Sequence, residues 1–108
     1  MRDWSHNALR GGYRLHAPDG RGVRSPALDA VDLPLLAIGI FGDSVAPLEA
    51  QRALLAMMPR ARIDERMLRG RDEDSPWARH FGWVRQPEAV VAACCDWLAQ
   101  RGSGTAAR

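Results

Sequence analysis

The strongest hydrophobic pattern in the chain is an uncharged run at residues 34–41, PLLAIGIF. The run is too short to cross a membrane and lacks polar alternation, which predicts a strand buried on both faces of a sheet. It ends at Gly42, and Asp43 then provides the first charged side chain. Ligands and catalytic groups gather at the carboxyl ends of strands in open α/β sheets, which makes Asp43 a candidate site residue. The alternative is that Asp43 only starts a turn or caps the following helix.

Three further elements are predicted after this strand. A helix is expected at about 48–58, where Pro59 stops it. The segment at about 61–68 partly alternates between apolar and charged side chains, which is typical of an outer strand. The polar segment 69–82 is expected to be a loop, and apolar positions spaced three and four apart predict a last helix at about 87–100. Strand, helix and strand in this order predict an α/β fold with two parallel strands joined by a crossover helix.

The two ends of the chain lack such patterns. Residues 1–32 contain several glycines and prolines without a sustained period, which predicts an irregular N-terminal arm. The segment 102–108 is expected to be a disordered tail. These expectations leave 33–101 as the folded segment.

Composition narrows the classes of partner and cofactor. The chain has 108 residues, of which 46% are hydrophobic and 26% charged. This length and composition are typical of a single globular domain. All fifteen basic residues are Arg, scattered among thirteen acids, so we expect neither a nucleic acid nor a membrane as partner. The chain has no long apolar run and no secretory signal, which predicts a cytoplasmic protein. Cys94 and Cys95 are adjacent and belong to no metal-binding motif, so we expect no disulfide, metal or cofactor.

One acid and one imidazole are predicted to meet at the same edge of the sheet. Asp43 follows the first strand and His80 lies in the segment after the second, and parallel strands end at the same edge. A buried carboxylate beside an imidazole fixes the tautomer and stabilises the imidazolium, as a general base serving a hydroxyl nucleophile requires. The other two histidines, His6 and His16, lie in the arm and are expected to be surface residues.

Four segments of the chain carry a resemblance to a known family. They are PLLAIGIF at 34–41, DSVAP at 43–47, RHFGW at 79–83 and CDWL at 95–98. Together they resemble the C-terminal portion of an alpha/beta-hydrolase, and most closely that of predicted bacterial hydrolases near the serine aminopeptidase group. The resemblance implies a partial alpha/beta-hydrolase fold in which Asp43 is the acid and His80 the base of a Ser-His-Asp triad. It covers about residues 30–100.

The nucleophile of that family is missing from the chain. The family places it on a Gly-x-Ser-x-Gly elbow upstream of the acid, and none of the five serines stands in such a pentapeptide. Removing the nucleophile costs a serine hydrolase about a millionfold in rate. The sequence therefore predicts a fragment or truncated homologue, inactive alone, that would act on a small acyl substrate only if a nucleophile-bearing part completed it. Exposed sheet surface in such a fragment predicts that the chain either is weakly folded alone or self-associates through this surface.

Two other interpretations remain open. The tetrapeptide FGDS at 41–44 resembles the first block of the GDS-type esterases, in which Ser44 would itself be the nucleophile. That family pairs its serine with an Asp-x-x-His motif, whereas Trp77 stands three residues before His80. The third interpretation is a non-enzymatic remnant or binding module.

Overall fold

The computed structural model describes residues 15–16, 19, 21, 23–24, 27–70 and 75–106. In chain order its elements are β1 (Leu15–His16), β2 (Val23–Arg24), the 3-10 helix η1 (Leu28–Ala30), β3 (Pro34–Ile40), α2 (Leu48–Ala56), β4 (Arg62–Leu68), α3 (Pro76–Arg85) and α4 (Glu88–Ala106). β1 and β2 form a short antiparallel pair, and β3 and β4 form a parallel pair. The predicted α/β fold class is confirmed.

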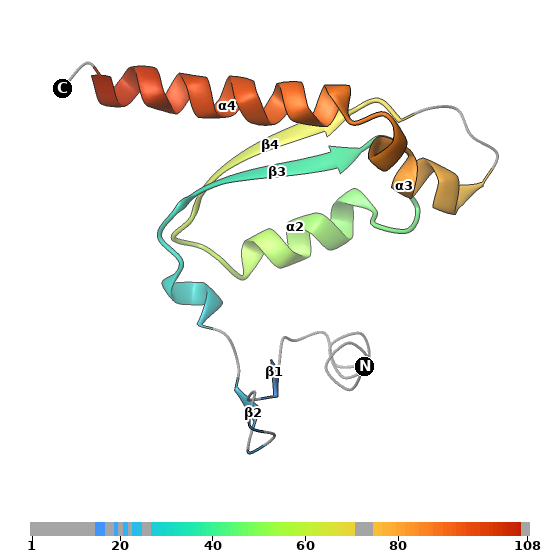
Figure 1. The fold of residues 1–108 in the computed structure, drawn as a ribbon. Helices are drawn as coiled ribbons and strands as arrows, with labels where there is room; N and C mark the ends of the chain where they lie inside the picture. The colour runs from blue at the N-terminus through green and yellow to red at the C-terminus, as the bar shows by residue number, and fades with distance from the viewer. Residues whose placement is uncertain are drawn as a thin grey trace.

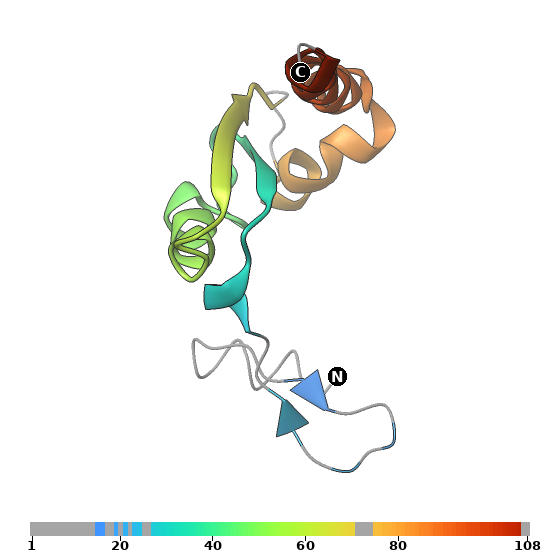
Figure 2. The same ribbon diagram turned by 90° about the vertical axis from the view of Figure 1, so that its left-hand side faces the viewer.

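β3 and β4 are the centre of the fold, as Figure 1 shows. Their parallel register runs from Pro34 opposite Arg62 to Ile40 opposite Leu68. α2 connects the two strands and lies on one face of the sheet, whereas α3 and α4 lie on the other side (Figure 2). The chain thus forms three layers, with a two-stranded sheet between helices.

The hydrophobic core lies between the sheet and α2. Ala37 of β3, Leu55 of α2 and Met58 after α2 form a buried cluster. Partly buried apolar residues surround it, namely Leu28, Val31, Leu35, Leu54, Ala61 and Ile63. Alternation along β3 places Leu35 and Ala37 on the face that α2 covers. The even-numbered residues of the strand lie on the face toward α4. β3 therefore packs on both faces, as its uncharged sequence predicts.

The helix ends differ from the predicted ones for local reasons. α2 ends at Ala56, two residues before the predicted end, because Pro59 disfavours helical geometry at the residue before it. The Met57 and Met58 N–H groups donate instead to the carbonyls of Leu54 and Leu55 in a tighter final turn.

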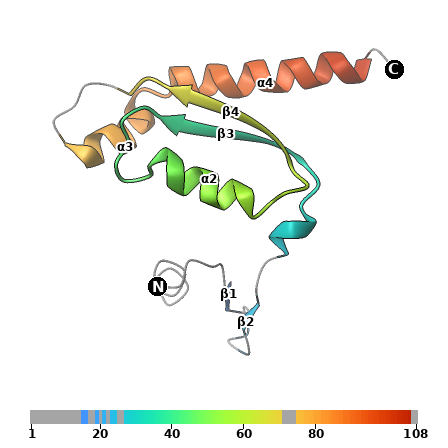
Figure 3. The same ribbon diagram turned by 180° about the vertical axis from the view of Figure 1, so that it is seen from behind.

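α4 runs to Ala106, well past the predicted end at residue 100, so the predicted disordered tail is helical as far as Ala106. Within this stretch the Ser103 hydroxyl donates to the Ala99 carbonyl at 3.0 Å. Its glycines weaken the helix without breaking it, because glycine costs only about 1 kcal/mol relative to Ala. Figure 3 shows these last turns extending past the strands.

The prediction that residues 69–82 form a loop is wrong for the second half of this segment. α3 begins at Pro76 and includes His80, so the imidazole is carried by a helix. A proline at the first helical position lacks only an N–H that has no helical partner, which makes it compatible with a helix start. Residues 71–74 lie outside the described residues.

Most of the predicted N-terminal arm, including His6, also lies outside the described residues. Its described parts include β1, which contains His16, and β2. Within the described part of the chain, no helix is both long enough and apolar enough to cross a membrane.

Candidate active site

Asp43 lies in the loop between β3 and α2 and is the only charged or polar residue among those described that is buried, with 7% of its surface exposed. Gly42 precedes it with a positive φ of 72°, which turns the chain sharply after the strand. The Asp43 Oδ1 atom accepts hydrogen bonds from the backbone N–H groups of Val45 at 2.9 Å and Ala46 at 3.0 Å. The alternative role as a turn former is therefore also observed, and it uses only one of the two carboxylate oxygens.

The other carboxylate oxygen contacts His80, which confirms the predicted pairing. His80 Nδ1 lies 2.7 Å from Asp43 Oδ2, within the range of a charge-assisted hydrogen bond. The His80 side chain is 26% exposed and that of Asp43 is 4% exposed. A buried carboxylate therefore contacts an imidazole that solvent reaches.

Opposing effects set the charge of Asp43. Burial raises the pKa of its carboxyl, whereas the hydrogen bonds from His80 and from the Ala46 and Val45 N–H groups lower it. The positive charge that His80 carries when protonated lowers it further, and the pKa lies below the ordinary value of 3.8 on balance. At neutral pH the side chain is a carboxylate and only accepts hydrogen bonds.

This charge fixes the tautomer of His80. Because the carboxylate has no proton to donate, Nδ1 carries the hydrogen, and in the neutral ring Nε2 holds the lone pair. In a Ser-His-Asp triad the acid binds Nδ1 and the nucleophile faces Nε2, so the pairing uses the required ring nitrogen. Among the described residues, Nε2 makes no hydrogen bond.

A second contact attaches α3 to the same loop. Arg79 Nη1 donates to the Gly42 carbonyl at 3.0 Å. Arg79 precedes His80 in the chain, and Gly42 likewise precedes Asp43. A Cβ atom at Gly42 would lie 3.0 Å from this nitrogen, so the glycine leaves room for the guanidinium. Sequence reasoning did not identify Arg79, although its position beside His80 in RHFGW was a usable signal.

Aromatic side chains of α3 lie beside His80. The Phe81 ring packs edge to face against the imidazole with centroids 4.6 Å apart, and Trp77 stacks on Phe81 at 6.1 Å. Phe81 is nonetheless 52% exposed and Trp83 is 45% exposed, so these rings do not exclude water from the imidazole.

The geometry expected of a GDS-type site is not present among the described residues. That interpretation requires a hydrogen bond from Ser44 Oγ to His80, and no such bond is formed there. His80 instead directs Nδ1 at Asp43, the residue before the serine.

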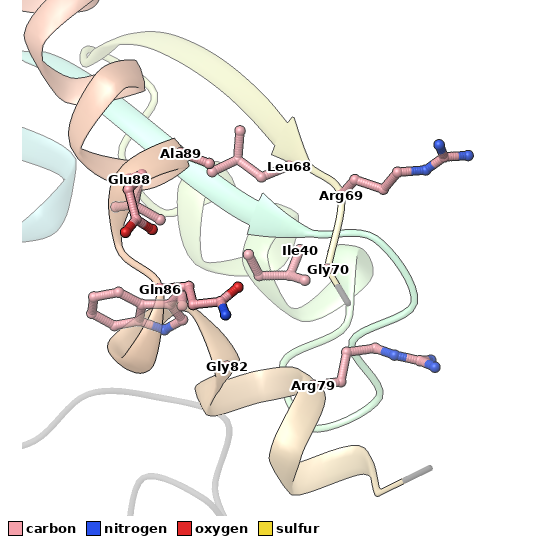
Figure 4. A pocket seen from close by; sticks show the side chains of 11 residues that line it. Ile40, Leu68, Arg69, Gly70, Arg79, Gly82, Gln86, Glu88 and Ala89 are labelled. Carbon is pink, nitrogen blue, oxygen red and sulfur yellow. The ribbon is translucent and has the colours of Figure 1, made fainter. Parts of the chain in front are cut away.

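A pocket of about 230 Å³ lies beside the strand ends (Figure 4). Ile40 and Leu68 come from the ends of β3 and β4, Gly82 from α3, and Glu88 and Ala89 from the start of α4. In Figure 4 the Arg69 and Arg79 guanidinium groups point away from these residues. Neither this pocket nor a second one, along α3, has Asp43 or His80 in its lining.

Within the described residues, no group of three His, Cys, Asp or Glu side chains is arranged to hold a metal ion. No protein-family model matches the chain, and comparison with curated proteins and with solved structures gives no significant match. The site is therefore interpreted from its own geometry.

Proposed function

We propose that this chain provides the acid and the base of a hydrolytic triad of the alpha/beta-hydrolase type, and that the nucleophile comes from outside the chain. Asp43 is the acid and His80 is the base. The observation that supports this proposal is the specific pairing of Asp43 Oδ2 with His80 Nδ1 at 2.7 Å. A histidine paired through Nε2, or exposed without a carboxylate, would lack this support.

The pair has a defined chemical task in such a triad. His80 Nε2 removes the proton of a hydroxyl nucleophile as its oxygen attacks the carbonyl carbon of a small ester or amide. The buried Asp43 carboxylate stabilises the imidazolium that forms, and His80 then protonates the leaving group. Water attacks the resulting acyl intermediate by the same route. Without a hydroxyl held near Nε2, the chain alone does not turn over esters at a useful rate.

An added alcohol can test the base without the missing nucleophile. We expect the chain to accelerate acetyl transfer from p-nitrophenyl acetate to trifluoroethanol, measured as formation of trifluoroethyl acetate. The variant His80→Ala should lose this acceleration. Asp43→Asn should lower it about a hundredfold, the lower end of the range for general-base catalysis, because an amide donor opposite Nδ1 favours the wrong tautomer. The double variant H6A/H16A is the matched histidine control and should behave as the parent chain.

Two results would contradict the proposal. The first is an unchanged transfer rate in His80→Ala, which would show that the imidazole does not act as the base. The second is labelling of Ser44 by a fluorophosphonate probe, since this reagent reacts with activated serine nucleophiles. Labelling of Ser44 would favour the esterase alternative, and we expect none.

A further inference from the structure

The two strands of the central sheet differ in how they protect their outer edges. β4 carries four charged side chains in seven residues, RIDERML, whereas β3 has none in PLLAIGI. Charged residues discourage an edge strand from pairing with another chain, and a long uncharged edge promotes such pairing. Among the described residues each strand has one hydrogen-bonded neighbour, so no described strand pairs with the edge of β3 that faces away from β4, called the open edge below.

The register identifies the backbone groups on this edge. The Leu33 carbonyl accepts from the Arg62 N–H, and the Phe41 N–H donates to the Leu68 carbonyl, so odd-numbered residues of β3 bond to β4. Strand alternation then directs the groups of Pro34, Leu36, Ile38 and Ile40 to the open edge. Among the described residues one of these groups is already bonded, because the Ile40 carbonyl accepts from the Asp43 N–H at 3.2 Å.

We propose that this edge pairs with the same edge of a second copy of the chain. The two β3 strands run antiparallel around a twofold axis at Ala37, which places Leu36 of one copy opposite Ile38 of the other. Each of these two opposed pairs exchanges two hydrogen bonds, as the wide antiparallel pairs of a sheet do. The result is a continuous four-stranded sheet in the order β4, β3, β3, β4.

The groups at the ends of β3 select this register. Pro34, which has no N–H, lies opposite Ile40, whose carbonyl is already occupied by Asp43. Pro34 therefore has no N–H to donate to the Ile40 carbonyl, and that carbonyl already accepts from Asp43. In the other direction the Ile40 N–H donates to the Pro34 carbonyl. Sliding one copy by two residues leaves either the Ile38 carbonyl or the Leu36 N–H without a partner. A second copy therefore satisfies this edge in one register better than in its neighbours.

Two exposed apolar side chains complete the match. Leu33 is 63% exposed and Phe41 is 62% exposed, and they lie four positions before and after Ala37. The twofold axis places Leu33 of each copy opposite Phe41 of the other. This is a narrow, non-hydrogen-bonded pair, in which Cα atoms are about 4.5 Å apart and side chains touch. Pairing therefore covers apolar surface at both ends of each β3 strand.

Sedimentation equilibrium tests the proposal on the whole chain. We expect a species of twice the 11.9 kDa chain mass. The variant L33K/F41K places two lysines opposite each other at each end and should sediment as a monomer with an unchanged circular dichroism spectrum. The matched control V91K/L98K adds the same charges at exposed apolar positions of α4 and should remain a dimer. A monomeric parent chain, or a dimeric L33K/F41K variant, would overturn the proposal.

Cysteine crosslinking tests the register. In a background with Cys94 and Cys95 replaced by Ala, L33C/F41C should form an intermolecular disulfide on mild oxidation, since opposed Cα atoms are within bridging distance. The single variant L33C should not, because its two cysteines would lie about 26 Å apart along the strands. Crosslinking of L33C alone at the same rate would contradict this register. The acetyl-transfer assay does not depend on these variants, so the catalytic proposal stands or falls separately.

Discussion

Two aspartates of the parallel strand pair, one just after β3 and one within β4, each bind a side chain from a later helix. Asp43 accepts from His80 of α3 at 2.7 Å, and Asp64 of β4 accepts from Trp97 Nε1 of α4 at 2.6 Å. Arg101 adds a second contact to Asp64 at 3.4 Å and lies over the Trp97 ring. Both carboxylates connect the sheet to a helix on the same side of the fold.

Burial separates the two contacts. The Asp43 side chain is 4% exposed, whereas that of Asp64 is 53% exposed. Hydrogen bonds to Trp97 and Arg101 lower the pKa of Asp64, as those to His80 and the loop lower the pKa of Asp43. In water, however, an exposed pair contributes little because solvent replaces each partner. Similar distances therefore describe a solvent-exposed contact at Asp64 and a buried, preorganised carboxylate at Asp43.

The largest expected effect comes from removing the buried carboxylate. Asp43→Ala leaves the Val45 and Ala46 N–H groups and His80 without their acceptor, which should cost about 2–3 kcal/mol in unfolding free energy. Asp64→Ala is the matched control and should cost less, because water can bind the released Trp97 and Arg101 donors. Urea unfolding of both variants measures the difference. Equal losses would show that burial does not distinguish the two sites.

A smaller effect should follow from changing the loop beside Asp43. Gly42→Ala forces a residue with a side chain to adopt a positive φ of 72° and brings its Cβ to 3.0 Å from Arg79 Nη1. The backbone conformation alone should cost about 1–2 kcal/mol. Gly102→Ala in α4 is the control, because its Cβ would meet no atom within 4 Å and a helix gains from alanine. Thermal unfolding should therefore shift down for the first variant and up for the second.

The smallest expected effect is a difference in acid sensitivity. Because Asp43 has a folded pKa below its unfolded value of 3.8, its contribution to stability is present above about pH 4 and is lost as the pH falls through the folded pKa. The same sign holds for Asp64. We therefore measure the unfolding free energy of Asp43→Asn and Asp64→Asn between pH 2 and 6. Each variant should lose less stability on acidification than the parent chain does. Added 1 M salt should weaken the Asp64 contribution more, since screening acts most on exposed charges. Equal salt sensitivity would contradict the comparison.

The sequence was most informative where local pattern and tertiary structure agree. The uncharged run at 34–41 identified the central strand, and Asp43 could be selected because it is the first charge after that strand. Parallel strands ending at one edge then led to His80 as its partner. The contact is observed because α3 folds back over the strand ends, which sequence spacing does not specify.

The sequence was least informative where one residue type has two structural meanings. Pro76 lies in the segment 69–82 that was predicted to be a loop, although proline also occupies the first position of helices, and α3 was therefore missed. The contact of Arg79 was missed because its acceptor is a backbone carbonyl, so only the position of Arg79 beside His80 pointed to it. The choice of Nδ1 over Nε2 likewise depends on the position of the ring in three dimensions.

The placement of His80 on α3 makes its contact with Asp43 depend on a local equilibrium. No residue of α3 is buried, and polar contacts from Arg79 and His80 attach the helix to the Asp43 loop. A segment with so little buried apolar surface opens at a lower free energy than the strands beneath it. Each opening separates the imidazole from its carboxylate while β3 and β4 remain paired. The effective strength of the proposed base is therefore its strength in the attached state multiplied by the fraction of molecules in which the helix is attached.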